Sequence, residues 1–428
     1  MADKNIPHVV DLTEVEPLLT SNESTPLLAQ STEDLTIPLT STFRQTTINS
    51  INFLMGMGLL SLPFALAKLG WIIGMSLLAL FCGMACFTAH LIGKCMTVQT
   101  PTGKPTSLYD IAFMAFGLPG KYLMITVFTL ELYTASVAMV ILFADSVISL
   151  VPSFLPHKIT IMVFAVVLMT PLALQKSMSR LSWTSFIGVL SLALLAFTIA
   201  WDGVSHTETP GSLINPAETR LWPLDWKDIG LGIGLLFVGL DGHAVFPTLY
   251  LDMSQPERYG ASMKTTYSFV GAFYAAISTM GYLMFGVSVL PEVTQNLPLI
   301  PSYNPQLTQL ALAFIALNPL TKFPMTLHPV NSTIELLLGV EERYVTLSRS
   351  LVVLSVLCVS ILFPSFHKVM GFIGAALSFL IAVILPTSCY LKLTYKEMSL
   401  LNKLTCITVL ALGVGFMIFG TVGVMLSE

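Results

Sequence analysis

Charged side chains are scarce in this sequence. Its 428 residues include 20 Lys and Arg and 24 Asp and Glu, so that 10% of the residues are charged, whereas soluble domains carry about 25%. This scarcity excludes an intrinsically disordered protein and a basic nucleic-acid-binding protein. Hydrophobic residues make up 54% of the chain and the mean hydropathy is +0.79, which indicates a polytopic membrane protein.

Cysteine is sparse as well, and catalytic motifs are absent from the sequence. The six cysteines lie in or beside apolar runs, and their spacing supports neither a zinc site nor a disulfide framework. The sequence contains no H-E-x-x-H, G-x-S-x-G or P-loop motif, which are the patterns of common metalloproteases, hydrolases and nucleotide-binding enzymes. We therefore expect no enzyme, no metal centre and no cofactor.

Residues 1–43 differ from the rest of the chain. They contain seven acidic residues against one basic residue and eleven Ser or Thr, a composition typical of a disordered tail. Two segments place an acid four residues before a Leu-Leu pair and resemble acidic dileucine sorting signals, which clathrin adaptors read to direct membrane proteins to lysosomes or vacuoles. A plain disordered tail is the alternative. The residues concerned are Glu14, Leu18, Leu19, Glu23, Leu27 and Leu28.

From Arg44 onward, long apolar runs alternate with short polar breaks. Their lengths predict an all-α domain over 44–428 with eleven membrane spans, which places the two termini on opposite sides. The predicted spans are 44–68, 71–94, 122–151, 159–176, 181–201, 228–250, 264–290, 306–338, 345–363, 367–391 and 404–426.

Basic residues indicate the orientation of these spans. If the tail is cytosolic, fourteen of the 20 Lys and Arg fall on the cytosolic side, and an excess of basic residues marks the cytosolic loops of membrane proteins. We therefore expect a cytosolic N-terminus and a lumenal C-terminus.

Two spans contain the residues that interrupt helices. Each has two glycines followed by a proline near mid-span, and each opens a set of five spans, over 44–201 and 228–391. Paired interruptions of this kind indicate an inverted-repeat transporter with broken helices at its binding site, with 404–426 as an additional helix. Close-packing kinks are the alternative. The residues are Gly56, Gly58 and Pro63 in the first span and Gly239, Gly242 and Pro247 in the sixth.

The two interruptions predict a site for a zwitterion. In the first span, free N–H groups near Gly58 and Leu59 would attract a carboxylate. In the sixth, free carbonyls from Phe237 to Gly239 would accept an ammonium group. The predicted substrate-binding residues are Asn52, Gly56, Met57, Gly58, Leu59, Phe237, Gly239, Asp241, Gly242 and His243.

Ionisable residues inside a span are functional candidates, because they are costly to place in a membrane. Six qualify: Glu131, Asp145, Asp241, His243, Lys322 and His328. Structural alternatives stay open for most of them. Asp145 would face lumenal water, Glu131 would cap a helix or form an ion pair, and His328 would be a packing residue. The predicted proton-coupling residues are Lys322, Asp241, His243 and Glu131.

Four segments resemble the amino acid/auxin permease family, within the amino acid–polyamine–organocation superfamily, and most closely its vacuolar amino acid transporter group. The likeness covers nearly all of the chain after the tail. The resemblance implies a LeuT-like fold of two five-helix inverted repeats plus an eleventh helix, with helices 1 and 6 broken. Asp241 departs from the family pattern, which commonly has a small or polar residue there. The segments are 52–71, 130–145, 242–256 and 318–336.

The resemblance also implies a role for Lys322. In LeuT-like folds one sodium site lies between helices one and eight, and an ammonium group on helix eight would make sodium unnecessary. Snorkelling or a static ion pair is the alternative for this lysine.

The resulting prediction is a proton-coupled secondary transporter of neutral amino acids in a vacuolar or lysosomal membrane. The Gly242–Pro247 segment resembles the branch that loads the lumen by exchanging protons for amino acids. Proton symport that exports amino acids from the lumen is one alternative, and an amino-acid sensor that signals through the tail is another. The expected partners are an amino acid, protons, the lipid bilayer and clathrin adaptor complexes, with no nucleic acid.

Overall fold

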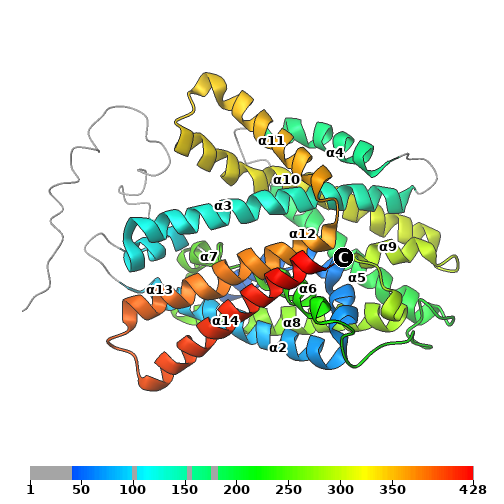
Figure 1. The fold of residues 1–428 in the computed structure, drawn as a ribbon, viewed down its shortest axis with the longest axis horizontal. Helices are drawn as coiled ribbons and strands as arrows, with labels where there is room; N and C mark the ends of the chain where they lie inside the picture. Colours follow the sequence, from blue (N-terminus) through cyan, green and yellow to red (C-terminus); the bar gives the residue numbers. More distant parts are fainter. Residues whose placement is uncertain (1–40, 99–103, 152–156, 175–181, 428) are drawn as a thin grey trace, which may run out of the picture. The chain divides into compact units, whose positions relative to one another are not determined.

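The computed structural model describes residues 41–98, 104–151, 157–174 and 182–427. The chain divides into two units after Leu39, and the predicted sorting residues belong to the first unit, which lies outside the described residues. The described part of the second unit is helical, and its only β-type pairing is an isolated bridge between Ser41 and Met253 (Figure 1). The predicted all-α class is therefore confirmed.

The helices are numbered in chain order. Their bounds are α1 (Phe43–Leu54), η3 (Met57–Ser61), α2 (Leu62–Cys95), α3 (Leu108–Leu150), α4 (Lys158–Ala173), α5 (Ser182–Ser205), α6 (Trp226–Phe237), η4 (Val238–Leu240), α7 (Phe246–Asp252), η5 (Pro256–Arg258), α8 (Tyr259–Phe285), η6 (Gly286–Ser288), α9 (Val293–Asn296), η7 (Leu297–Leu299), α10 (Pro305–Leu338), η8 (Glu342–Tyr344), α11 (Val345–Leu362), α12 (Phe366–Phe372), the π-helical η9 (Ile373–Ile384), α13 (Leu385–Thr394) and α14 (Leu400–Leu426).

Local sequence signals account for several of these helix ends. Thr42 and Gln45 form a reciprocal capping box at the start of α1, which satisfies backbone N–H groups that the first turn leaves unpaired. Asn304 caps α10 directly before Pro305, and Gly339 ends the same helix in a left-handed conformation. Proline in the first turn and glycine after the last are the positions at which these residues favour a helix.

A sharp turn divides α2 into two legs. Gly70 has φ +70°, and a Cβ placed on it would lie 2.7 Å from the backbone of Leu221 and Trp222. Glycine is therefore required there both by conformation and by space. The turn lies between the predicted spans 44–68 and 71–94.

Eight helical stretches of the described residues are long and apolar enough to cross a membrane. Of the predicted spans, 44–68 is interrupted, and only its part from residue 57 onward belongs to one of these stretches, Met57–Cys95. The interrupted span 228–250 belongs to none of them, and 159–176 corresponds to the shorter apolar stretch Lys158–Pro171. The count of eleven crossings stays a prediction. We call the face of the bundle at which α1 begins the amino-terminal face, and the other the distal face.

Both predicted helix interruptions are present. After α1, Met55 leaves helical geometry and Gly56 is extended before η3 begins. After α6 and η4, Asp241 is extended, and regular helix resumes only at α7. The prediction that the first and sixth spans are broken is confirmed.

The two interruptions lie side by side. A Cβ on Gly58 would be 3.0 Å from the Cα of Gly239. The hydroxyl of Tyr274, on α8, is within hydrogen-bonding distance of two carbonyl oxygens, Leu54 O at 2.8 Å and Gly239 O at 3.0 Å. One tyrosine therefore holds the ends of both first half-helices together.

The chain just before α1 is attached to the segment that follows α7. The amide of Ser41 donates to the carbonyl of Asp252 at 3.0 Å, and the amide of Ser254 donates to the carbonyl of Ser41 at 2.9 Å. The Ser41 hydroxyl also donates to the Asp252 carboxylate. These bonds join the two half-helices at the amino-terminal face.

Candidate functional site

A cavity of about 520 Å³ lies between the two interruptions. Its walls come from α1, η3, α3, η4, α7, α10, α12 and η9, and it extends toward the amino-terminal face past Asn49 and Phe53 of α1. Toward the distal face, Leu59 and Leu60 are buried. Seven of the predicted substrate-binding residues line the cavity: Asn52, Gly56, Met57, Gly58, Gly239, Asp241 and Gly242.

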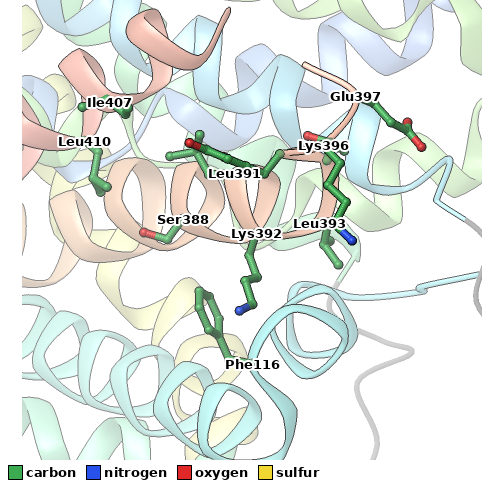
Figure 2. A pocket seen from close by; sticks show the side chains of 11 residues that line it. Phe116, Ser388, Leu391, Lys392, Leu393, Lys396, Glu397, Ile407 and Leu410 are labelled. Atoms are coloured by element: carbon green, nitrogen blue, oxygen red, sulfur yellow. The ribbon is translucent and has the colours of Figure 1, made fainter. Parts of the chain in front are cut away.

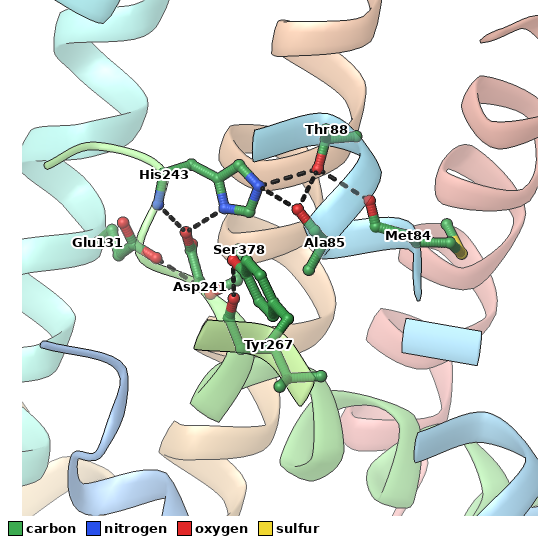
Figure 3. A network of polar contacts seen from close by, with 9 residues as sticks. Met84, Ala85, Thr88, Glu131, Asp241, His243, Tyr267 and Ser378 are labelled. Atoms are coloured by element: carbon green, nitrogen blue, oxygen red, sulfur yellow. Dashed lines mark hydrogen bonds and ion pairs between the residues drawn. The ribbon is translucent and has the colours of Figure 1, made fainter. Parts of the chain in front are cut away.

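The structure places the other three predicted substrate-binding residues elsewhere. Leu59 and Phe237 are fully buried, and the ring of Phe237 stacks on that of Phe379 with centroids 3.8 Å apart. His243 is also fully buried, on the side of Asp241 that faces α2 (Figure 3). These three side chains support the walls and are not among the cavity's lining residues.

Two carboxyl groups meet at the cavity wall. Glu131 of α3 and Asp241 both line the cavity, and their side chains lie within hydrogen-bonding reach of each other. The Ser378 hydroxyl, from the π-helical η9, donates to Glu131 Oε1 at 3.0 Å. Figure 3 shows that these groups come from three separate parts of the chain, which are α3, the second interruption and η9. Glu131 is thus neither a helix cap nor the partner of a basic residue among the described ion pairs.

His243 links Asp241 to α2. Its backbone amide donates to Asp241 Oδ1 at 3.2 Å, and its ring Nδ1 is 3.5 Å from the same oxygen. On the other side of the ring, Nε2 is 2.8 Å from Thr88 Oγ1 and 3.1 Å from the Ala85 carbonyl. A carbonyl oxygen can only accept, so Nε2 is assigned as the donor and Nδ1 faces the carboxyl group.

Lys322 lines the cavity from α10. Its side chain lies against α5, since a Cβ on Gly188 would be 2.8 Å from its Cε and 3.1 Å from its Nζ. One turn earlier on α10, the amide of Asn318 donates to Ser191 Oγ at 3.0 Å. The glycine and this hydrogen bond let α5 and α10 approach closely around the amine.

One expectation about the second interruption needs correction. The carbonyls from Phe237 to Gly239 are predicted to be free for an ammonium group, and for Gly239 this is wrong. Instead Gly239 O accepts from Tyr274 and Leu240 O accepts from Tyr267, each at 3.0 Å. Buried carbonyls without partners are costly, so the neighbouring tyrosines satisfy them. The anionic group exposed to the cavity at this interruption is the side chain of Asp241.

The remaining predicted ionisable residues lie away from this cavity. Asp145 is 9% exposed and pairs with Lys158 at 2.5 Å, so the expectation that it would face open water is wrong. His328 lies on α10 with a buried Nδ1 that has no hydrogen-bond partner within the described ranges.

Sequence reasoning missed several residues of the site and its surroundings. Thr88, Tyr274 and Ser378 orient the buried polar groups, but single hydroxyls in apolar helices carry no distinctive pattern. Glu292, which follows α8, is fully buried although it lies in a polar loop in the sequence.

A second hollow lies at the amino-terminal face, apart from the predicted site residues. It has a volume of about 840 Å³ and is lined mainly by α13, α14 and the turn between them, together with Phe116 of α3. In Figure 2, Lys392 and Phe116 project toward each other across it. Its lining includes neither helix interruption.

Comparisons with known proteins agree with this geometry. A family model described as transmembrane amino acid transporter protein matches residues 39–426. The chain is 30% identical over 421 residues to amino acid transporter AVT1B of Arabidopsis thaliana, covering 94% of this chain and 74% of the relative. It is 23% identical to sodium-coupled neutral amino acid symporter 2 of Danio rerio, covering 84% and 77%.

Solved structures show the same fold at low sequence identity. The structure of MhsT in complex with L-phenylalanine aligns with a TM-score of 0.55 and 11% identity, covering 89% of this chain and 98% of that one. The inward-facing conformation of Mhp1 aligns with a TM-score of 0.56 and 11% identity, covering 90% and 89%. The chain therefore belongs to the transmembrane amino acid transporter protein family and adopts a LeuT-like fold, and it is a transporter and not an enzyme.

Proposed function

We propose that this protein exchanges protons for neutral amino acids and loads them from the cytosol into a vacuolar or lysosomal lumen. The observation that carries the proposal is the cavity between the two helix interruptions, which contains the Glu131–Asp241 carboxyl pair and Lys322. The amino end of η3 attracts the carboxylate of a zwitterion, and the Asp241 carboxylate attracts its ammonium group. Both groups lie at the same cavity.

The substrate's orientation follows from the polarity of the two interruptions. Its carboxylate lies at the start of η3, where Gly56, Met57 and Gly58 line the cavity and the amino end of a helix favours an anion. The amide of Leu59 donates to the carbonyl of Gly56 at 3.3 Å, so it is not one of the groups that would bind the carboxylate. Its ammonium group lies at Asp241, because the nearby carbonyls are already hydrogen-bonded. The rest of the lining is largely apolar, including Phe128, Leu132 and Met139, which favours an uncharged side chain.

Competition for Asp241 makes the coupling an exchange. Two carboxyl groups in contact at a site with little water share one proton, because two adjacent negative charges there are strongly unfavourable. An arriving ammonium group supplies the positive charge in place of that proton. Proton and amino acid then occupy the site alternately, which is the requirement for antiport.

Lys322 provides a basic group in the lining of the same cavity. An ammonium group at that place leaves no need for a coupling sodium ion, although sodium is named for the Danio rerio relative. The close contact with Gly188 holds the amine near α5, so that movement of α5 relative to α10 changes its surroundings.

The direction of loading follows from orientation. The cavity extends toward the amino-terminal face, which the excess of basic residues assigns to the cytosol. The two acidic dileucine segments of the tail support delivery to a vacuole or lysosome, through clathrin adaptors that bind them.

Reconstitution tests the proposal directly. Purified protein in liposomes with an acidic interior and an internal pH dye should take up labelled neutral amino acids and alkalinise the interior at the same time. Uptake that requires an acidic exterior would identify symport instead. Uptake that needs sodium, or no gradient-dependent flux for any amino acid, would contradict proton exchange.

A further inference from the structure

A buried carboxyl group that no N–H or hydroxyl group satisfies lies near the distal face. Glu292 is 0% exposed, and neither of its carboxylate oxygens accepts a hydrogen bond from an N–H or hydroxyl donor among the described residues. It directly precedes α9 and is the N-cap residue of that helix, but its side chain makes no capping hydrogen bond. The substrate site does not use it, and its burial requires a separate explanation.

The neighbours of Glu292 are a second acid and one base. Its carboxyl group lies within hydrogen-bonding reach of that of Asp145 on α3. Lys158, at the start of α4, pairs with Asp145 at 2.5 Å and donates to the carbonyl of Pro364 at 2.8 Å. With both acids ionised, this buried cluster has two negative charges and one positive charge.

Other charged groups stand further out, around Lys158. His367 of α12 lies close enough to Lys158, Lys68 and Lys368 to interact electrostatically with them. Its ring packs edge-on against Phe64. Lys68 is paired with Asp228 at 2.9 Å. The interactions resolved for Glu292 itself involve only Asp145 and Lys158, so these outer groups leave the extra negative charge uncompensated.

The segment that carries Glu292 covers the first interruption. The Ser61 hydroxyl, at the end of η3, donates to the carbonyl of Pro291 at 2.8 Å. Val293 and Leu297 are completely buried, and α9 packs against both η3 and α3. We call residues 289–299 the distal lid, because they lie over the helix that separates the cavity from the distal face.

Burial and charge together favour a protonated form of the closed lid. The pKa of Glu292 is raised well above its ordinary value, first by burial and then by the neighbouring Asp145 carboxyl group. A carboxyl group that keeps its proton can donate a hydrogen bond to the other acid, and Asp145 remains free to pair with Lys158.

We propose that Glu292, Asp145 and Lys158 form a second proton-binding site, distinct from Glu131 and Asp241, in which one proton shared by the two carboxyl groups holds the distal lid closed. The proton enters from water at the distal face and returns to it when the lid opens. This site therefore biases the conformation without carrying protons across the membrane. It rests on the proposed function only in identifying the distal face with an acidic lumen.

The sign of the pH effect follows from the raised pKa of Glu292. At a pH below the ordinary pKa of glutamic acid, Glu292 holds its proton whether the lid is closed or open. In the closed lid the pKa of Glu292 is raised, and as the pH rises through this pKa the proton is lost. The two carboxylates then repel each other, and the closed lid loses stability. An acidic lumen thus favours the state whose cavity faces the cytosol.

Amide hydrogen exchange of the distal lid tests this site without measuring transport. Purified protein is compared between about pH 5 and about pH 8, with rates corrected for the pH dependence of intrinsic exchange. We expect residues 289–299 to exchange at least about tenfold more slowly at the acidic end. Equal corrected protection at both ends would overturn the proposal.

Two substitutions separate a proton site from a packing contact. Glu292→Gln should keep the lid protected at every pH, because the amide imitates the protonated acid. Lys158→Met removes the only cation of the cluster, so the two acids should hold their shared proton more tightly. The pH at the midpoint of the change in lid protection should then rise by about one unit or more. If Lys158→Met instead opens the lid at acidic pH, the contact is structural and the proposal fails.

Controls keep the result independent of the proposed transport mechanism. Glu208→Gln changes an exposed acid of the distal-face loop and should leave the pH dependence of the lid intact. Glu131→Gln should also leave the pH dependence of the lid intact, even if it abolishes the transport of amino acids against protons. Failure of the proposed transport mechanism is therefore distinguishable from failure of the second proton site. If Glu292→Gln does not fold, Asp145→Asn serves as the second variant and should likewise remove the pH dependence of lid protection. If lid protection in Asp145→Asn still depends on pH, the proposal is overturned.

Discussion

Gly58 of the first helix interruption packs directly on Gly239 of the second, so closely that a Cβ on Gly58 would lie 3.0 Å from the Cα of Gly239. The contact brings the two backbone ends of opposite polarity to one cavity. Side chains at either position would separate those ends, and with them the groups proposed to bind the two charges of an amino acid.

Gly58→Ala should therefore destabilise the protein and reduce uptake. The added methyl group meets backbone on the facing helix, and overpacking of this kind costs about 1–3 kcal/mol. Gly83→Ala is the matched control, because a Cβ there would have no neighbour within 4 Å. Thermal unfolding in detergent should show a lower Tm for the first variant only. Equal Tm values would show that the interruptions tolerate a wider separation.

Asp241→Asn should weaken amino acid binding and remove its dependence on pH. The substrate ammonium loses a charged partner, a hydrogen bond worth about 1.5–3 kcal/mol, which corresponds to a loss of about ten- to a hundredfold in affinity. Glu131→Gln is the informative comparison, since it keeps the ammonium contact and removes the shared proton. We expect near-normal affinity with reduced pH dependence, measured by ligand-induced thermal shift across pH. Wild-type affinity in Asp241→Asn would contradict the binding role of this acid.

Lys322→Met should abolish proton-coupled transport while the protein still folds. Methionine retains most of the length of the side chain beside Gly188 but removes the charge. Lys392→Met, in the hollow shown in Figure 2, controls for loss of a lysine elsewhere. Proteoliposome uptake and size-exclusion profiles separate the two effects. Normal transport by Lys322→Met would remove the lysine from the mechanism.

The tail signals can be tested in cells. Replacing Leu18, Leu19, Leu27 and Leu28 by Ala should move the protein to the cell surface, because the dileucine pairs are the adaptor-binding elements of such signals. Leu35→Ala with Leu39→Ala is the control, since these leucines belong to neither pair. Fluorescence microscopy of tagged protein gives the distribution. Unchanged vacuolar or lysosomal localisation of the fourfold variant would show that these segments are not the sorting signal.

Much of the helical frame could be predicted, because its determinants are local. Apolar run length sets where helices begin and end, and the glycines and prolines mark both interruptions. Gly70 even gives the boundary between the first two predicted spans. Signals of this kind need no knowledge of what packs against them.

The site residues were harder to predict, because their orientation depends on distant helices. His243 is two positions after Asp241, but its ring turns away from the cavity because Thr88 and Ala85 of α2 offer hydrogen-bond partners. Phe237 stacks on Phe379 inside the protein and is not among the residues that line the cavity. Glu292 appears as an ordinary loop acid until the packing of α9 on η3 and α3 buries it. None of these partners is near in sequence.

The hydrogen bonds between Ser41 and the segment after α7 have a mechanical consequence. They join the outer ends of α1 and α7, while Tyr274 joins the inner ends of α1 and η4. α1 is thus attached to α7 at its outer end and to η4 at its inner end. A movement of α1 that opens or closes the cavity would therefore have to displace α7, η4 or both.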